Sequence, residues 1–330
     1  MKKIALYIIL SLIINNIHAQ RYMEKLNRDP VAIRTSDEKV FISWRKLGTD
    51  PENILFNLYR GSERIITTAR TNYTDTIENN KNYYIKPLIE GKELAASRPV
   101  KVSSKPYLSL PLRELDGDYY VHMTWVGDLN GDGSYDYVVD RLPTSDEGTP
   151  KLEGYLSDGT FLWQVDMGPN SKIKSDWNDN PPASISGFGN TALYRDNDNV
   201  TVYDLNNDGK AEVFVRTADG VMFNDSTTLE YPDARTQFIS VIDGLTGEEL
   251  THTMLPRDYI GDGPLSGHMG IAYVDGTNPS LIYECQNRKD PPPKVHYNMF
   301  VLAYDYNGER LNLKWKWDNN SVDIAAPIFH

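Results

Sequence analysis

A repeated acidic turn constrains the fold of this chain more than any other feature of its sequence. The segment GDLNGDGSYDYVVD occupies residues 127–140, YDLNNDGKAEVFVR occupies 203–216, and a shorter version, YVDGTNPSLIYE, occupies 273–284. Their leading residues, 76 and 71 positions apart, are Asp128, Asp204 and Asp275. Each turn runs directly into an apolar, strand-like segment, so the chain repeats one strand-rich unit three times.

A hairpin signal follows each acidic turn. The dipeptides Asp158-Gly159, Thr246-Gly247 and Asn307-Gly308 each lie between two apolar runs. Such dipeptides favour tight turns between antiparallel strands. Units of this kind are typical of propeller blades, and we expect a partial propeller of about three blades over residues 107–330. Polar stretches at 170–200, 255–268 and 286–296 are predicted to form long loops between strands.

The first two acidic turns have the composition of calcium-binding loops. Calcium takes about six to eight oxygen ligands in a flexible geometry, and a D-x-N-x-D-G-x-x-[D/E] turn can supply most of them. Each turn continues into β-like sequence rather than a helix, which excludes an EF-hand. The alternative is a pair of turns closed by their own side chains. The predicted ligands are Asp128, Asn130, Asp132, Asp136 and the Ser134 carbonyl in the first turn, and Asp204, Asn206, Asp208, Glu212 and the Lys210 carbonyl in the second.

The segment 22–104 has the pattern of a β-sandwich. Apolar residues alternate with polar ones in KVFISW at 39–44 and in ILFNLY at 54–59, which predicts half-buried strands. Within it, residues 30–103, with their spaced aromatic residues, resemble a fibronectin type III-like sandwich. We therefore expect an all-β chain in which a sandwich precedes the partial propeller.

The first 19 residues predict a secretory signal peptide. Lys2 and Lys3 precede an apolar stretch at 4–14 that is short for a membrane span, and Ala19 ends the segment. The alternative is a short N-terminal anchor. A signal peptide in a bacterial protein implies a secreted or periplasmic location, with no membrane contact after its removal.

Charge and cysteine content narrow the possible partners. The formal net charge is −12, which argues against nucleic acid and anionic membranes. An anionic polysaccharide stays possible because bound cations can reverse the local sign of charge. The only cysteine is Cys285, so the chain has no internal disulfide and metal ions could stabilise its loops instead.

The sequence also resembles a known family. The opening RYMEKLNRDPVAIRTSDEKVFISWRKLGTDPENILFNLYR at 21–60 is similar to the start of polysaccharide lyase family 11, and VGDLNGDGSYDYVV, VYDLNNDGKAEVFVRTADG and IAYVDGTNPSLI resemble its first blades in order. The resemblance implies an N-terminal sandwich, an eight-bladed calcium-rich propeller, and calcium-dependent β-elimination at galacturonate O4 of rhamnogalacturonan I, an anionic polysaccharide of plant cell walls. Because three blades are counted, we expect a truncated form.

The resemblance leaves the catalytic base open. Familiar members carry an Asn where this chain has His122, and a Lys-Trp-Asp-Pro run where it has residues 140–143. Roles are therefore not carried over at these places. Several residues are candidates for a catalytic role in a substrate cleft, and each could instead have a structural or surface role. The candidates are His122, Asp140, Arg141, Arg216 and His268.

Two other functions fit the same motifs. One is a non-catalytic, calcium-binding propeller module that binds glycans or proteins. The other is a glycoside hydrolase of similar layout, which would need two carboxylates flanking the scissile bond. The opening segment before the propeller favours the lyase.

Overall fold

The structure is a computed structural model that describes residues 21–76, 81–145, 148–171, 199–233, 236–257, 265–288 and 297–319. The predicted signal peptide at 1–19 and most of the three predicted long loops lie outside these ranges. Apart from one 3-10 turn, η1 (Pro169–Ser171), the regular structure of the described residues is β. Within the same residues, no helix is long and apolar enough to cross a membrane.

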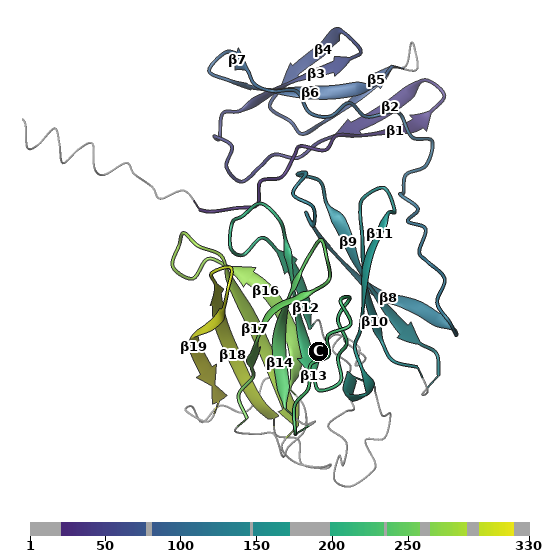
Figure 1. The fold of residues 1–330 in the computed structure, drawn as a ribbon. Helices are drawn as coiled ribbons and strands as arrows, with labels where there is room; N and C mark the ends of the chain where they lie inside the picture. The colour runs from purple at the N-terminus through teal and green to yellow at the C-terminus, as the bar shows by residue number, and fades with distance from the viewer. Residues whose placement is uncertain are drawn as a thin grey trace, which may run out of the picture.

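The N-terminal part consists of two antiparallel sheets (Figure 1). The first has the strand order β1-β2-β5 and the second the order β4-β3-β6-β7. Their strands are β1 (Val31–Ser36), β2 (Lys39–Ser43), β3 (Leu55–Arg60), β4 (Glu63–Thr68), β5 (Asn72–Thr76), β6 (Tyr83–Ile89) and β7 (Lys92–Glu93).

The alternation predicted at 39–44 and 54–59 places its apolar residues in the core between these two sheets. Val40 and Ile42 of β2 are buried against Phe56 and Leu58 of β3. The two strands belong to different sheets, so the chain crosses from one layer to the other between them. This arrangement is a sandwich, as the sequence predicts.

Three four-stranded antiparallel sheets follow, each with its strands in sequential order (Figure 1). We call them blades 1, 2 and 3. Blade 1 contains β8 (Tyr119–Gly127), β9 (Asp136–Pro143), β10 (Lys151–Tyr155) and β11 (Phe161–Asp166). Blade 2 contains β12 (Val200–Tyr203), β13 (Glu212–Ala218), β14 (Gln237–Asp243) and β15 (Glu249–Met254). Blade 3 contains β16 (Ser266–Ala272), β17 (Ser280–Arg288), β18 (Tyr297–Tyr306) and β19 (Leu311–Asp318).

The blades have the connectivity that the sequence predicts. An acidic turn joins the first and second strands of each blade, and each predicted hairpin joins the last two strands. Gly159, Gly247 and Gly308 have φ values of 90°, 73° and 89°, which glycine adopts without steric cost. The described residues therefore form a sandwich followed by three blades of an open propeller.

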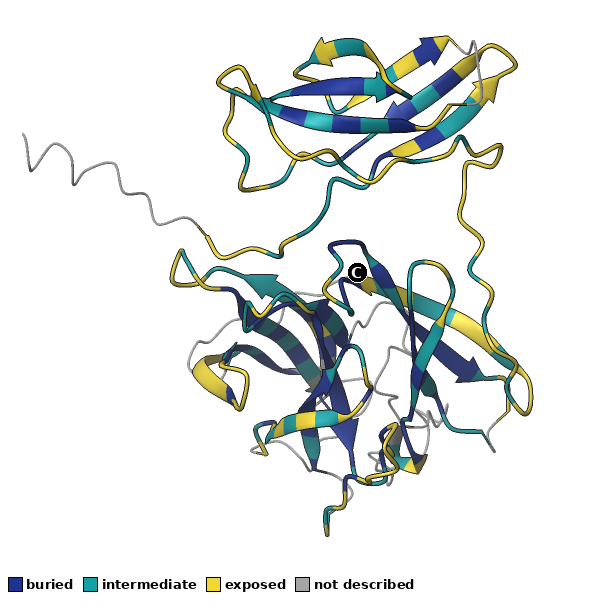
Figure 2. Ribbon diagram, turned by 45° about the horizontal axis from the view of Figure 1, so that its top comes forward, coloured by how far each residue is buried: buried dark blue, intermediate teal, exposed yellow. Residues whose placement is uncertain are grey.

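The apolar core lies between neighbouring blades, and one cluster joins blade 1 to blade 2. It includes Val138 and Trp163 of blade 1, and Val213 and Val215 of blade 2. A second cluster joins Phe214 of the same β13 strand to blade 3. Every residue of β13 is buried (Figure 2), because successive side chains of one strand face two different neighbours.

Trp163 is the largest side chain buried between blades 1 and 2. Its Nε1 donates a hydrogen bond of 2.7 Å to the Gly244 carbonyl oxygen in blade 2. The ring lies against the hairpin glycine Gly247, where a Cβ atom would come within 2.5 Å of Trp163 Cγ. Glycine at position 247 thus serves the turn and also leaves space for the indole.

A strap formed by residues 21–29 ties the sandwich to the blades. The backbone N–H of Asn27 donates to the Gly133 carbonyl in the first acidic turn, and that of Tyr22 donates to the Thr277 carbonyl in the third. Arg45 of the sandwich lies over the Tyr135 ring, 4.2 Å from its centroid. The acidic turns therefore lie at the end of the blades that faces the sandwich (Figure 1).

Replacing Trp163 by alanine is expected to lower the free energy of unfolding by about 3–5 kcal/mol, because it leaves a cavity and an unsatisfied carbonyl between two blades. Urea titration followed by circular dichroism measures this value. The control Leu250→Ala changes a side chain that is 45% exposed on β15 and should cost less than about 1 kcal/mol. Equal, small effects of both substitutions would show that Trp163 does not hold the blades together.

Candidate functional site: the acidic turns and a His–Asp pair

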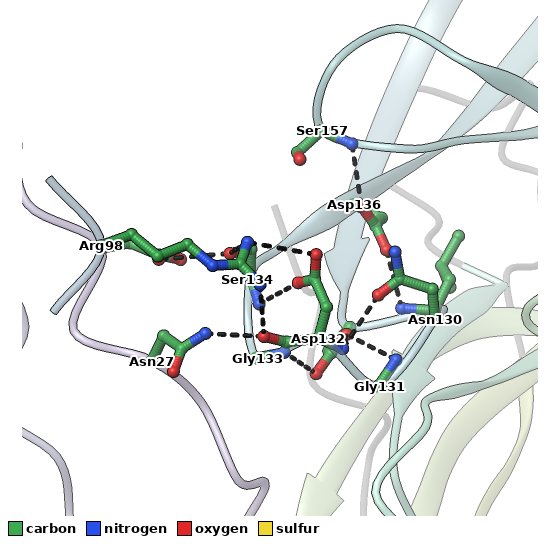
Figure 3. Close-up of polar contacts among 12 residues, drawn as sticks. Asn27, Arg98, Asn130, Gly131, Asp132, Gly133, Ser134, Asp136 and Ser157 are labelled. Carbon is green, nitrogen blue, oxygen red and sulfur yellow. Dashed lines mark hydrogen bonds and ion pairs between the residues drawn. The ribbon is translucent and has the colours of Figure 1, made fainter. Parts of the chain in front are cut away.

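The first acidic turn is closed by hydrogen bonds from its own backbone (Figure 3). Asp128 Oδ1 accepts from the N–H groups of Gly131 and Asp132, and Oδ2 accepts from Gly133 N–H at 2.6 Å. Asp136 accepts from Leu129 N–H and, across the sheet, from Ser157 N–H. A carboxylate has about four acceptor sites, so these oxygens keep lone pairs for a cation.

The second acidic turn repeats this arrangement. Asp204 Oδ2 accepts from Gly209 N–H at 2.9 Å, and Glu212 accepts from Leu205 N–H at 3.1 Å. Asp204 Oδ1 is buried and, among the described residues, has no hydrogen bond of good geometry. The amide of Asn206 lies between Asp208 and Glu212, so the predicted ligands of this turn are close neighbours.

The third acidic turn differs from the first two. Asp275 is exposed, and both its oxygens are held by Thr277 N–H and by the backbone and side-chain N–H groups of Asn278. These hydrogen bonds hold the pKa of Asp275 well below its usual range. This turn is an ordinary Asx turn, which agrees with its degenerate sequence.

Burial raises the pKa values of the carboxylates in the first two turns. It raises the pKa of Asp136 to about 6 and that of Glu212 to about 8. The pKa values of Asp128 and Asp204 are raised for the same reason, desolvation, with the backbone hydrogen bonds opposing it. A bound cation would compensate these buried charges. The donor set, carboxylate and amide oxygens with main-chain carbonyls, fits calcium.

The turn oxygens do not already converge on one point. Within the described ranges, no three His, Cys, Asp or Glu side chains are grouped as metal ligands. Most of the carboxylate oxygens in these turns accept hydrogen bonds from backbone N–H groups instead. Bringing the predicted ligands of one turn onto a single ion therefore takes side-chain rotation within that turn.

Two side chains, one from the sandwich and one from the strap, contact the first turn from outside. Arg98 forms an ion pair of 3.2 Å with Asp132 Oδ2, and the Asn27 amide donates to the Asp132 carbonyl (Figure 3). Burial, together with the nearby charges of Asp204 and Asp128, raises the pKa of the strap residue Glu24 to about 7. Sequence reasoning missed Glu24, because no spacing rule relates position 24 to turns more than a hundred residues away.

Among the five catalytic candidates, the structure brings His122 and Asp140 together. His122 Nδ1 lies 3.3 Å from Asp140 Oδ2, between adjacent strands β8 and β9. Asp140 is fully buried, whereas the His122 side chain is 23% exposed. Hydrogen bonding to Asp140 raises the pKa of His122, with burial opposing the shift.

The other three candidates have different surroundings. Arg141 forms a buried ion pair with Glu153, 3.1 Å, and donates to the Arg113 carbonyl. Arg216 is buried between blades 2 and 3 and donates to the Leu265 carbonyl. His268 is exposed on β16, opposite Glu284 of β17. Arg141 and Arg216 thus have structural contacts that account for their positions.

Comparison with known families covers almost all of the described chain. Residues 21–103 match the β-sheet domain of rhamnogalacturonan I lyases. Residues 113–326 match the C-terminal domain of rhamnogalacturonan lyase family 11. The chain belongs to rhamnogalacturonan lyase family 11.

Characterised members of family 11 are similar over the same region. The chain is 30% identical to the rhamnogalacturonan exolyase YesX and to the rhamnogalacturonan endolyase YesW of Bacillus subtilis, in each case over 93% of this chain and 52% of the relative. The solved rhamnogalacturonan lyase of Bacillus licheniformis superposes with a TM-score of 0.72 at 28% identity, over 92% of this chain and 54% of that one. The chain spans about half the length of these family 11 relatives.

The raised pKa of Glu212 predicts how stability depends on pH when no metal is bound. The unfolded chain loses this proton near the ordinary value of 4.5, whereas the folded protein keeps it to about pH 8. The folded state thus binds more protons between these values, so stability falls as pH rises through this window. In the presence of a chelator, the melting temperature should therefore decrease as the pH is raised from 5 to 8.

The Glu212→Gln variant should show a smaller decrease than the wild type over this range. The control Glu309→Gln changes an exposed residue and should leave the wild-type decrease unchanged. If the melting temperature falls by the same amount between pH 5 and 8 in all three proteins, the assignment to Glu212 is contradicted.

Proposed function

We propose that this chain is a calcium-dependent rhamnogalacturonan lyase that cleaves rhamnogalacturonan I by β-elimination at galacturonate O4. The observation that carries the proposal is the family match of both parts of the chain, in the family order. The relatives named above are an exolyase and an endolyase, so the mode of cleavage stays open here. The proposed export by residues 1–19 suits a polymeric substrate that does not enter the cell.

We propose calcium at the first and second acidic turns, with the ligands given by the sequence. Support comes from the buried carboxylates Asp136, Asp204 and Glu212 and from the Asp204 oxygen without a good hydrogen bond. Calcium held there would supply positive charge that allows these carboxylates to stay ionised. The turns lie at the sandwich end of the blades, whereas His122 and Asp140 lie farther along β8 and β9. Calcium in the turns would therefore have a structural role.

The chemistry requires a base for the C5 proton and stabilisation of the charge that develops on the uronate. Candidate groups in the described blades are His122, Asp140 and His268. Arg216 and Arg141 are cations, but each is committed to backbone or carboxylate partners. His122 and His268 are more exposed than Arg141 and Arg216, so the histidines are the more accessible groups.

Calcium should raise the melting temperature of the chain by about 5–10 °C when its concentration is about 100 times the dissociation constant. Asp204→Ala should reduce this increase, because it removes the leading ligand of the second turn. Asp275→Ala is a matched control, since it changes the exposed leading aspartate of the third turn, where no calcium is proposed. Differential scanning fluorimetry with calcium and with EDTA measures both effects. Equal calcium responses in the two variants would count against a site at Asp204.

Incubation of the chain with rhamnogalacturonan I and calcium should increase ultraviolet absorbance, because β-elimination leaves an unsaturated uronate. EDTA should abolish the increase. New reducing ends without the absorbance would indicate hydrolysis. Retention of the polysaccharide by a folded, calcium-loaded protein with no cleavage would instead indicate a binding module.

A further inference from the structure

The pair formed by His122 and Asp140 is placed by an irregularity in blade 1. Strands β8 and β9 pair regularly from Gly127 to Thr124, and the register then shifts before Val121. His122 lies within this shift. A β-bulge redirects a side chain relative to the regular ladder, and bulges are common beside active sites. Here it brings the imidazole to a fully buried carboxylate while leaving part of the ring exposed.

The pair has the arrangement of an oriented base. Asp140 has no exposed surface, and its Oδ2 faces His122 Nδ1. A carboxylate at Nδ1 favours the neutral tautomer that carries its proton on that nitrogen, which leaves Nε2 as an acceptor. Since the His122 side chain is partly exposed and the Asp140 carboxylate is not, His122 is the member of the pair open to a substrate.

The equivalent positions of the other blades have different roles. Asp140, Arg216 and Glu284 each stand four residues after the first residue of the second strand. Opposite Arg216 is Asn199, whose side-chain oxygen accepts from Gly267 N–H and from the Tyr283 hydroxyl. Arg216 and Asn199 therefore join blade 2 to blade 3. Blade 3 also places a histidine opposite a carboxylate, His268 opposite Glu284, but there the histidine is exposed and the carboxylate is only partly buried. In blade 1, the carboxylate at this position is fully buried and contacts a partly exposed histidine.

We propose that His122 is the base that accepts the C5 proton of galacturonate and that Asp140 is the residue that positions it. This inference rests on the lyase function proposed above. The proton moves from C5 to Nε2, the C5–H electron pair forms the C4–C5 double bond, and the C4–O4 bond breaks. The departing O4 oxygen keeps its electron pair and takes a proton from solvent.

A matched pair elsewhere in the chain provides the control. His252 Nδ1 lies 3.2 Å from Glu249 Oε2 on β15, and Glu249 raises the His252 pKa as Asp140 raises that of His122. The two pairs thus share their chemistry and hydrogen-bond geometry. His252 lies on the last strand of blade 2, whereas His122 lies on the first strand of blade 1.

His122→Ala should lower kcat by about 10²–10⁴-fold, the usual contribution of a general base, with KM changed less than about threefold. His252→Ala should retain wild-type kcat. Asp140→Asn should lower kcat and move the rising limb of the pH–kcat/KM profile to lower pH, because the His122 pKa is no longer raised by the carboxylate. Circular dichroism and calcium-dependent melting would verify that each variant is folded.

A second readout does not need turnover. In NMR spectra of the full chain, a reduced rhamnogalacturonan I oligosaccharide should shift the ring resonances of His122 and leave those of His252 unchanged. Full activity in His122→Ala would overturn the inference while the lyase function stands. If the wild-type chain gives no elimination, the function proposed for this chain fails. The inference then depends on NMR: shifted His122 resonances support a uronate at this pair, and unshifted ones overturn it.

Discussion

The blades depend on the hydrogen bonds between the leading aspartate of each acidic turn and the backbone of that turn. Asp128 and Asp204 each hold backbone N–H groups that would otherwise be unsatisfied, and this fixes the reversal between the first two strands of a blade. The Asp128 carbonyl also accepts from Ala211 N–H in the next turn. Blade 2 is therefore joined to blade 1 through the same few residues. The turns thereby help to place neighbouring blades so that their apolar side chains pack against each other.

Keeping carboxylates buried has an electrostatic cost. Desolvation dominates the environment of Asp128, Asp136, Asp204 and Glu212, and it raises all four pKa values. Hydrogen bonds from the backbone reduce this cost without removing it. A divalent cation held by such carboxylates would offset this cost, because it supplies positive charge beside them. The third turn exposes Asp275 and has no such requirement.

Sequence patterns predicted the fold well because its signals are local. Two-residue alternation identifies β2 and β3, and Asn307-Gly308 identifies the hairpin between β18 and β19 by turn chemistry alone. The site was less predictable, since it depends on register. His122 and Asp140 were both candidates, but their contact depends on a bulge that no local pattern reveals. Arg141 is next to Asp140 in sequence, yet it points to the opposite face of β9 and pairs with Glu153.

The strap has a consequence for the order of folding. Its contacts join residues that are 105 positions apart at Asn27 and Asp132, and 251 apart at Tyr22 and Tyr273. Strands within a blade, by contrast, pair with near neighbours in the chain. Closing long loops is slow and entropically unfavourable until both ends are structured. The strap should therefore dock after the three turns have formed, as the last cooperative unit to close and the first to open.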